Sequence, residues 1–85
     1  MLMNNIIDLD QTVKDICTTY PEVKDILIEL GFKPLANPLM FNALASKTTL
    51  RNGARIARIP LQLIIQTLQW NGYEIKGADN NDSTY

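Results

Sequence analysis

Residues 20–38 read YPEVKDILIELGFKPLANP, and this stretch decides how the rest of the chain is arranged. Pro21 suits the first turn of a helix, where its missing N–H and fixed φ do no harm. Gly31 suits the position just past a helix, because glycine adopts a left-handed conformation without a Cβ clash. We therefore predict a helix over 21–30 that ends at Gly31, after which Phe32 folds back onto it.

The bend that follows contains two prolines. Pro34 and Pro38 favour extended backbone at the residues before them, so we predict a rigid turn. Asn37 can cap a new helix and Pro38 can open it. The bend therefore returns the chain across the helix that precedes it.

The segments on either side also carry helical patterns. Apolar residues recur at helical spacing in each of them, and Asp10 is placed to cap the first. Gly53 lies inside the fourth helix, where it costs up to about 1 kcal/mol relative to alanine, which indicates close packing against a neighbour. The predicted helices, besides 21–30, run over 12–19, 38–45, 50–58 and 61–71.

The predicted fold class is all-α, a compact array of four to five short helices with one short extended segment at its N-terminus. That segment is Ile6–Leu9, which we expect to pair with Tyr73–Ile75. Eighty-five residues are enough for one domain. We place a single helical domain at 1–75 and a disordered polar tail at 76–85.

Charge is distributed unevenly, although the net charge is only −1. Residues 1–29 carry six acids and two lysines, whereas residues 30–73 carry five basic residues and no acid. One interpretation is two solvated faces that attract each other weakly. The other is a basic face for an acidic partner or a nucleic acid. The candidate basic face consists of Lys47, Arg51, Arg55 and Arg58.

Several features point to the cytoplasm. The single cysteine, Cys17, excludes an intrachain disulfide and fits a reducing compartment. It lies on the apolar side of the first predicted helix, so we interpret it as a small core residue. The first residues show no basic region followed by a long apolar run, so we expect no signal peptide. No stretch approaches the roughly 20 apolar residues of a membrane span.

Residue patterns for catalysis or metal binding are missing. The chain has no histidine, which is the commonest general base and metal ligand near neutral pH. Asp8 and Asp10 lack the spacing of a calcium loop. The sequence has no glycine-rich phosphate loop and no nucleophile elbow. We predict no catalytic, cofactor-binding or metal-binding residues, and a protein that is not an enzyme.

Some large apolar side chains are hard to bury in so small a core, and an exposed apolar patch marks a partner site. If five short helices wrap all of them, they are ordinary core residues. If not, they form a surface for a homodimer or for another cytoplasmic protein, and this interaction or regulatory role is the function we predict. The candidate partner surface consists of Met40, Phe41, Leu63 and Trp70.

Two alternatives remain open. The helices over 50–58 and 61–71 could form a helix-turn-helix, with the basic face on phosphates and with Gln62, Gln66 and Gln69 at base edges. The mostly aliphatic second helix argues against this reading. The other alternative is a small-ligand pocket between helices, lined by Phe32, Met40, Phe41 and Trp70.

Three parts of the sequence together resemble a known family. They are TVKDI at 12–16 leading into YPE at 20–22, then LGF at 30–32 with NPL at 37–39, then the helical pattern that ends in NGY at 71–73. From Ile6 to Ile75 the chain resembles the small bacterial helical family catalogued as domain of unknown function 1858. The resemblance implies a compact helical module that occurs alone or fused to sensor and hemerythrin-like iron domains in bacteria.

Many members of that family carry a cysteine pair in the turn after the Gly-Phe. The matching positions here are Pro34 and Asn37. Any metal or redox role of that pair is therefore not open to this chain.

Overall fold

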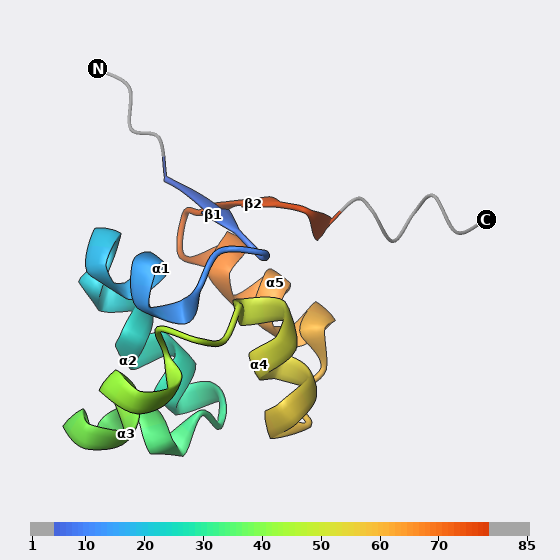
Figure 1. The fold of residues 1–85 in the computed structure, drawn as a ribbon. Coiled ribbons are helices and arrows are strands. Elements are labelled where there is room, and N and C mark those ends of the chain that lie inside the picture. The colour runs from blue at the N-terminus through green and yellow to red at the C-terminus, as the bar shows by residue number, and fades with distance from the viewer. Residues whose placement is uncertain (1–4, 79–85) are drawn as a thin grey trace.

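The chain folds into five α-helices, one 3-10 helix and a two-stranded sheet within residues 5–78, which the computed structural model describes (Figure 1). Each predicted helix is confirmed to within one residue at either end. The elements are β1 (Ile6–Asp8), α1 (Val13–Thr19), α2 (Pro21–Leu30), η1 (Lys33–Ala36), α3 (Pro38–Leu44), α4 (Leu50–Ala57), α5 (Leu61–Trp70) and β2 (Glu74–Lys76).

Helix α2 begins and ends as its sequence predicts. Pro21 is its first residue, and Gly31 follows it with a φ of 130°. The N–H of Phe32 donates to the carbonyl of Leu27 at 3.0 Å, which satisfies one of the free carbonyls at the helix end. This bond turns the chain back, and Phe32 is buried.

Two local predictions are wrong. Asp10 does not cap α1, because Thr12 Oγ1 accepts from the N–H of Asp15 at 3.1 Å and so takes that position. Lys33, directly before Pro34, is not extended either. It is the first residue of η1, because a 3-10 turn tolerates proline in its opening positions.

Strands β1 and β2 bring the two ends of the described chain together (Figure 1). They pair in parallel, with Ile6 opposite Glu74, Ile7 opposite Ile75 and Asp8 opposite Lys76. This confirms the predicted pairing of 6–9 with 73–75. Ile7 is fully buried, so the small sheet covers one side of the core.

The predicted tail is described only over its first three residues. Lys76 ends β2, and its carbonyl accepts from the N–H of Leu9 at 3.0 Å. The carbonyl of Gly77 accepts from Arg51 Nη2 at 3.1 Å. The rest of the predicted tail, 79–85, lies outside the described residues.

The core lies where α1, α2, α4 and α5 meet under the sheet. Within residues 5–78, no charged or polar side chain is buried. The buried side chains are Ile7, Leu9, Val13, Ile16, Cys17, Val23, Leu27, Phe32, Leu35, Ala45, Leu50, Ala54, Ile64, Ile65, Leu68 and Tyr73.

The connection between α3 and α4 is fixed against the start of α1. The first N–H groups of a helix have no partner within it. In α1 they find partners outside: Val13 donates to the carbonyl of Thr48 at 2.8 Å, and Lys14 donates to that of Ala45 at 3.0 Å. These bonds hold Val13, Ala45 and Thr48 side by side.

Candidate functional site

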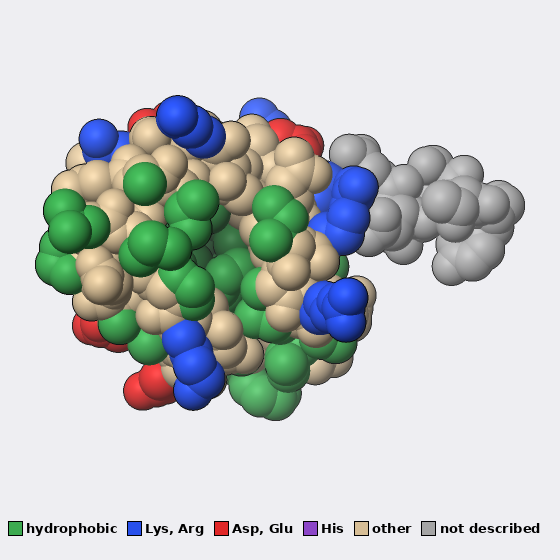
Figure 2. Space-filling model, turned by 60° about the horizontal axis from the view of Figure 1, so that its bottom comes forward, with side chains coloured by type: hydrophobic (Ala, Val, Ile, Leu, Met, Phe, Trp, Pro, Cys, Tyr) green, Lys and Arg blue, Asp and Glu red, His purple; other side chains and the backbone are tan. Residues whose placement is uncertain are grey.

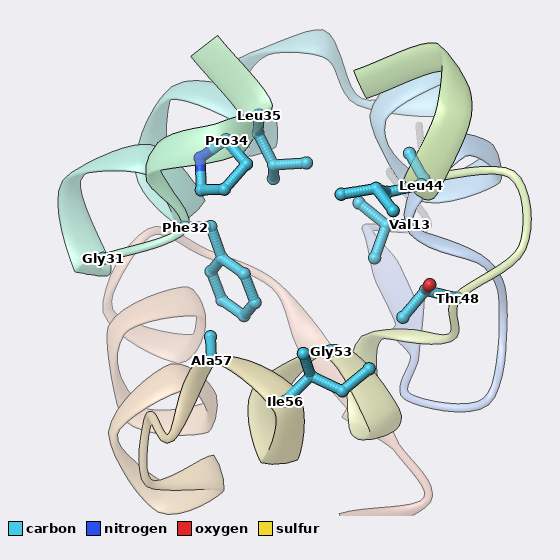
Figure 3. Close-up of a pocket in the computed structure, with 11 residues that line it drawn as sticks. Val13, Gly31, Phe32, Pro34, Leu35, Leu44, Thr48, Gly53, Ile56 and Ala57 are labelled. Carbon is cyan, nitrogen blue, oxygen red and sulfur yellow. The ribbon is translucent and has the colours of Figure 1, made fainter. Parts of the chain in front are cut away.

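An open apolar cavity of about 320 Å³ lies between η1 and the end of α3 on one side and α4 on the other. Figure 3 shows Pro34 and Leu35 facing Ile56 and Ala57 across it, with the Phe32 ring between them. We call this cavity the apolar groove. Its lining residues are Val13, Gly31, Phe32, Pro34, Leu35, Leu44, Ala45, Thr48, Gly53, Ile56 and Ala57.

The groove exists because α3 is held away from α4. Helix α3 packs on η1, while α4 packs on α5. No residue of α3 is buried, so this helix forms a raised wall rather than part of the core. Asn37 fixes its start, because Asn37 Oδ1 accepts from the N–H of Leu39 at 2.9 Å.

Gly53 lies at the bottom of the groove, where the absence of a side chain leaves the cavity open. A Cβ at Gly53 would lie 3.4 Å from Phe32 Cε1, 3.5 Å from Thr48 Cγ2 and 3.9 Å from Val13 Cγ2. The close approach of α4 to Phe32 confirms the close packing predicted for this position. Any larger side chain at Gly53 would enter the groove from below.

Apolar side chains at the rim of the groove are exposed to solvent. Ile56 is 74% exposed and Leu44 is 44% exposed, although both line the groove. Figure 2 shows the hollow from outside, with hydrophobic side chains both in it and around it. Single exposed apolar residues are common, but a cluster around a cavity marks a binding surface.

A second, polar hollow of about 300 Å³ adjoins the groove. We call it the basic hollow. Its lining residues are Lys47, Thr48, Asn52, Arg55 and Ile56, so Thr48 and Ile56 belong to both cavities.

The predicted basic face is only partly available. Arg51 Nε donates to Asp10 Oδ1 at 3.0 Å, and its Nη2 reaches the carbonyl of Gly77. The hydrogen bond from Arg51 lowers the pKa of Asp10. Arg51 therefore ties α4 to the end of β2, and among the predicted residues Lys47, Arg55 and Arg58 are left to face solvent.

The predicted partner surface is divided between two helices. Met40 and Leu63 are both 42% exposed, and Trp70 is 82% exposed. Phe41 is half-buried, with Lys24 Nζ 4.6 Å from the centre of its ring. None of the four lines the groove.

The ligand pocket predicted from the sequence is therefore wrong in its lining. Of its four residues only Phe32 borders the groove. The reason lies in the packing, because α3 rests on η1 whereas α5 rests on α2 and α4. Met40 and Phe41 of α3 therefore do not converge with Trp70 of α5.

The sequence reasoning missed the residues that form the groove. Ile56 follows Arg55 in a helix whose basic residues suggested a charged face, and Leu44 lies in a helix from which only Met40 and Phe41 were singled out. The available signal was the number of small residues, because Gly53, Ala45 and Ala57 leave space where larger side chains would fill it.

The model of the family described as Domain of unknown function (DUF1858) matches residues 7–65. The chain belongs to this family. The DUF1858 match includes every residue that lines the groove, from Val13 to Ala57, whereas Trp70 lies beyond it.

A solved structure shares the DUF1858 chain's fold. It is the crystal structure of a conserved domain protein from Streptococcus pneumoniae TIGR4, with 48% sequence identity and a TM-score of 0.84. The similarity covers 93% of this chain and 100% of the streptococcal one. No curated protein matches the chain.

Three further features of this DUF1858 chain concern metal binding, the membrane and its cysteine. Over residues 5–78, no three histidine, cysteine or acidic side chains gather as metal ligands would. No helix in the same range is both long and apolar enough to cross a bilayer. Cys17 is buried as predicted, and desolvation raises the pKa of its thiol to about 11.

A pair of tyrosines, Tyr20 and Tyr73, links the start of α2 to the residue before β2. The Tyr73 O–H donates to the Glu22 carboxylate, and the ring of Tyr20 meets that of Tyr73 edge to face at 5.1 Å. Burial and the Glu22 carboxylate raise the pKa of Tyr73, while the hydrogen bond from Tyr73 lowers the pKa of Glu22.

Proposed function

We propose that this protein is a non-catalytic interaction module of the bacterial cytoplasm, whose apolar groove receives apolar side chains from a segment of a partner protein. The observation that carries the proposal is an open apolar cavity of about 320 Å³ with Ile56 exposed at its rim. Ligand and peptide sites in proteins are concave and lined mostly by apolar side chains.

The groove suits a chain segment better than a flat surface. Amphipathic helices are commonly bound by laying their apolar face into such a groove. Fully burying one isoleucine or leucine is worth about 1.5–3 kcal/mol, so covering Ile56 and Leu44 and filling the floor supplies several kcal/mol. Because association costs about 4–15 kcal/mol, that cost offsets most of this gain, and we expect a weak complex.

A matched pair of variants tests this proposal. Ile56 and Leu39 are 74% and 79% exposed, but only Ile56 lines the groove. The probe is a short helical peptide with leucine on one face and glutamine on the other, followed by fluorescence anisotropy. We expect Ile56→Gln to weaken binding about tenfold, in line with the loss of one apolar contact, and Leu39→Gln to leave it unchanged. Equal effects of the two variants would refute the proposal.

A second candidate is a homodimer through α5. Trp70, the chain's single tryptophan, is 82% exposed, and Leu63 lies two turns before it at 42% exposure. Aromatic residues in this setting are enriched at interfaces. Light scattering over a range of protein concentrations tests the dimer, with Trp70 emission as a second signal. A constant monomer mass and an unshifted emission at high concentration would eliminate it.

A further inference from the structure

The two hollows meet on α4. They share Thr48 and Ile56, so an occupant of the apolar groove passes directly beside the basic hollow. Within residues 5–78, Lys47 and Arg55 take part in no ion pair, whereas Arg51, one turn before Arg55, is bound to Asp10. The basic hollow therefore presents cations without a counter-charge from the described chain.

The segments that surround the groove also carry positive rather than negative charge. Residues 30–73 contain no acid, and the acids nearest in sequence to the lining, Asp15 and Glu29, are two positions from it. Figure 2 shows Lys and Arg side chains below and to the right of the hollow as well as along the upper margin of the molecule, whereas the acidic side chains visible in this view lie at the margin. The basic residues adjacent in sequence to lining residues are Lys14, Lys33, Lys47, Arg55 and Arg58.

We propose that the segment bound in the apolar groove is acidic and amphipathic. Its apolar side chains enter the groove, and an aspartate or glutamate beside them lies in the basic hollow, near Lys47 and Arg55. This inference rests on the proposed function and adds the chemistry of the partner. A small apolar acid fits the same charges less well, because it would leave Ile56 and Leu44 exposed to water.

Peptides that differ only in charge test the inference. Three short helical peptides share the same leucines and carry glutamate, glutamine or lysine on the opposite face. An exposed ion pair changes affinity by roughly 1.5- to 5-fold, so two pairs should favour the glutamate peptide over the glutamine peptide about fivefold at low salt. The lysine peptide should bind most weakly. At about 1 M salt, where the screening length is about 3 Å, the difference should vanish.

Variants assign the preference to the basic hollow. The double variant Lys47→Gln, Arg55→Gln should lose the preference and bind the glutamate and glutamine peptides equally. Lys76→Gln removes a charge from β2, away from the groove, and should keep the preference. Equal binding of both peptides to the native protein at low salt, a preference that survives the double variant, or tighter binding of decanoate than of the glutamate peptide would overturn the inference. If none of the three peptides binds, the proposed function itself has failed.

Discussion

Replacing Gly53 by alanine should stabilise the protein, which tests the description of the groove floor. Glycine inside a helix costs about 1 kcal/mol relative to alanine. The new methyl group would make ordinary contacts, 3.4 Å from Phe32 Cε1 and 3.5 Å from Thr48 Cγ2, and each such contact is worth about 0.1–0.2 kcal/mol. Allowing for a small adjustment of the Phe32 ring, we expect Gly53→Ala to raise the free energy of unfolding by about 0.5–1 kcal/mol.

Replacing Gly31 by alanine should instead lower the free energy of unfolding. Gly31 has a φ of 130°, and a Cβ there would lie 3.1 Å from Ile59 Cδ1. We expect Gly31→Ala to cost about 1–3 kcal/mol. Calorimetry should show a rise of about 2–8 °C in the melting temperature for Gly53→Ala and a fall for Gly31→Ala. A destabilised Gly53→Ala protein would mean that the floor has no room for a methyl group and that the groove is shallower than described.

Three further predictions concern the core, the tyrosine pair and the end of β2. In urea unfolding, Ile64→Ala should cost about 2–5 kcal/mol, because Ile64 is fully buried, while Trp70→Ala should change stability by less than about 0.5 kcal/mol. The pKa of Tyr73 is raised on folding, so the Tyr73 hydroxyl adds to the free energy of unfolding below its usual pKa of 10.0, and this stabilisation is lost as pH rises above that value. The Tyr73→Phe variant should therefore lose less stability at alkaline pH than the native protein. The pKa of Glu22 is lowered on folding, so the stabilisation from its hydrogen bond with Tyr73 is lost from the native protein as pH falls through that pKa. The Tyr73→Phe variant, which lacks this bond, should not show that loss. Arg51→Met should speed amide exchange at Leu9, whose N–H bonds to the carbonyl of Lys76, and Arg55→Met should not; equal exchange in both variants would remove Arg51 as the link to β2.

The order of the helices could be predicted because its signals are local. Pro21 opens α2 and Gly31 ends it through their own backbone conformations, and Thr49 caps the start of α4 because its side chain accepts from the N–H of Asn52. The pairing of Ile6–Asp8 with Glu74–Lys76 could also be predicted, since few other β-branched segments remain once the helices are assigned.

The groove could not be predicted, because it depends on distances between elements. Nothing in the sequence of α3 indicates that it rests on η1 and stays clear of α4. The role of Arg51 was missed for the same reason, since Asp10 is 41 positions away in sequence and reaches it only after the chain has folded. Periodicity identifies an apolar face but does not show what that face packs against.

The most direct test of the interaction proposal is to locate the bound peptide by NMR, through nuclear Overhauser contacts between the methyl groups of the leucine–glutamine peptide and those of the protein. The groove account predicts contacts to Val13, Leu35 and Leu44, which line the floor and the α3 side of the cavity. Contacts confined to Leu63 and Trp70 would contradict it and would place the binding surface on α5.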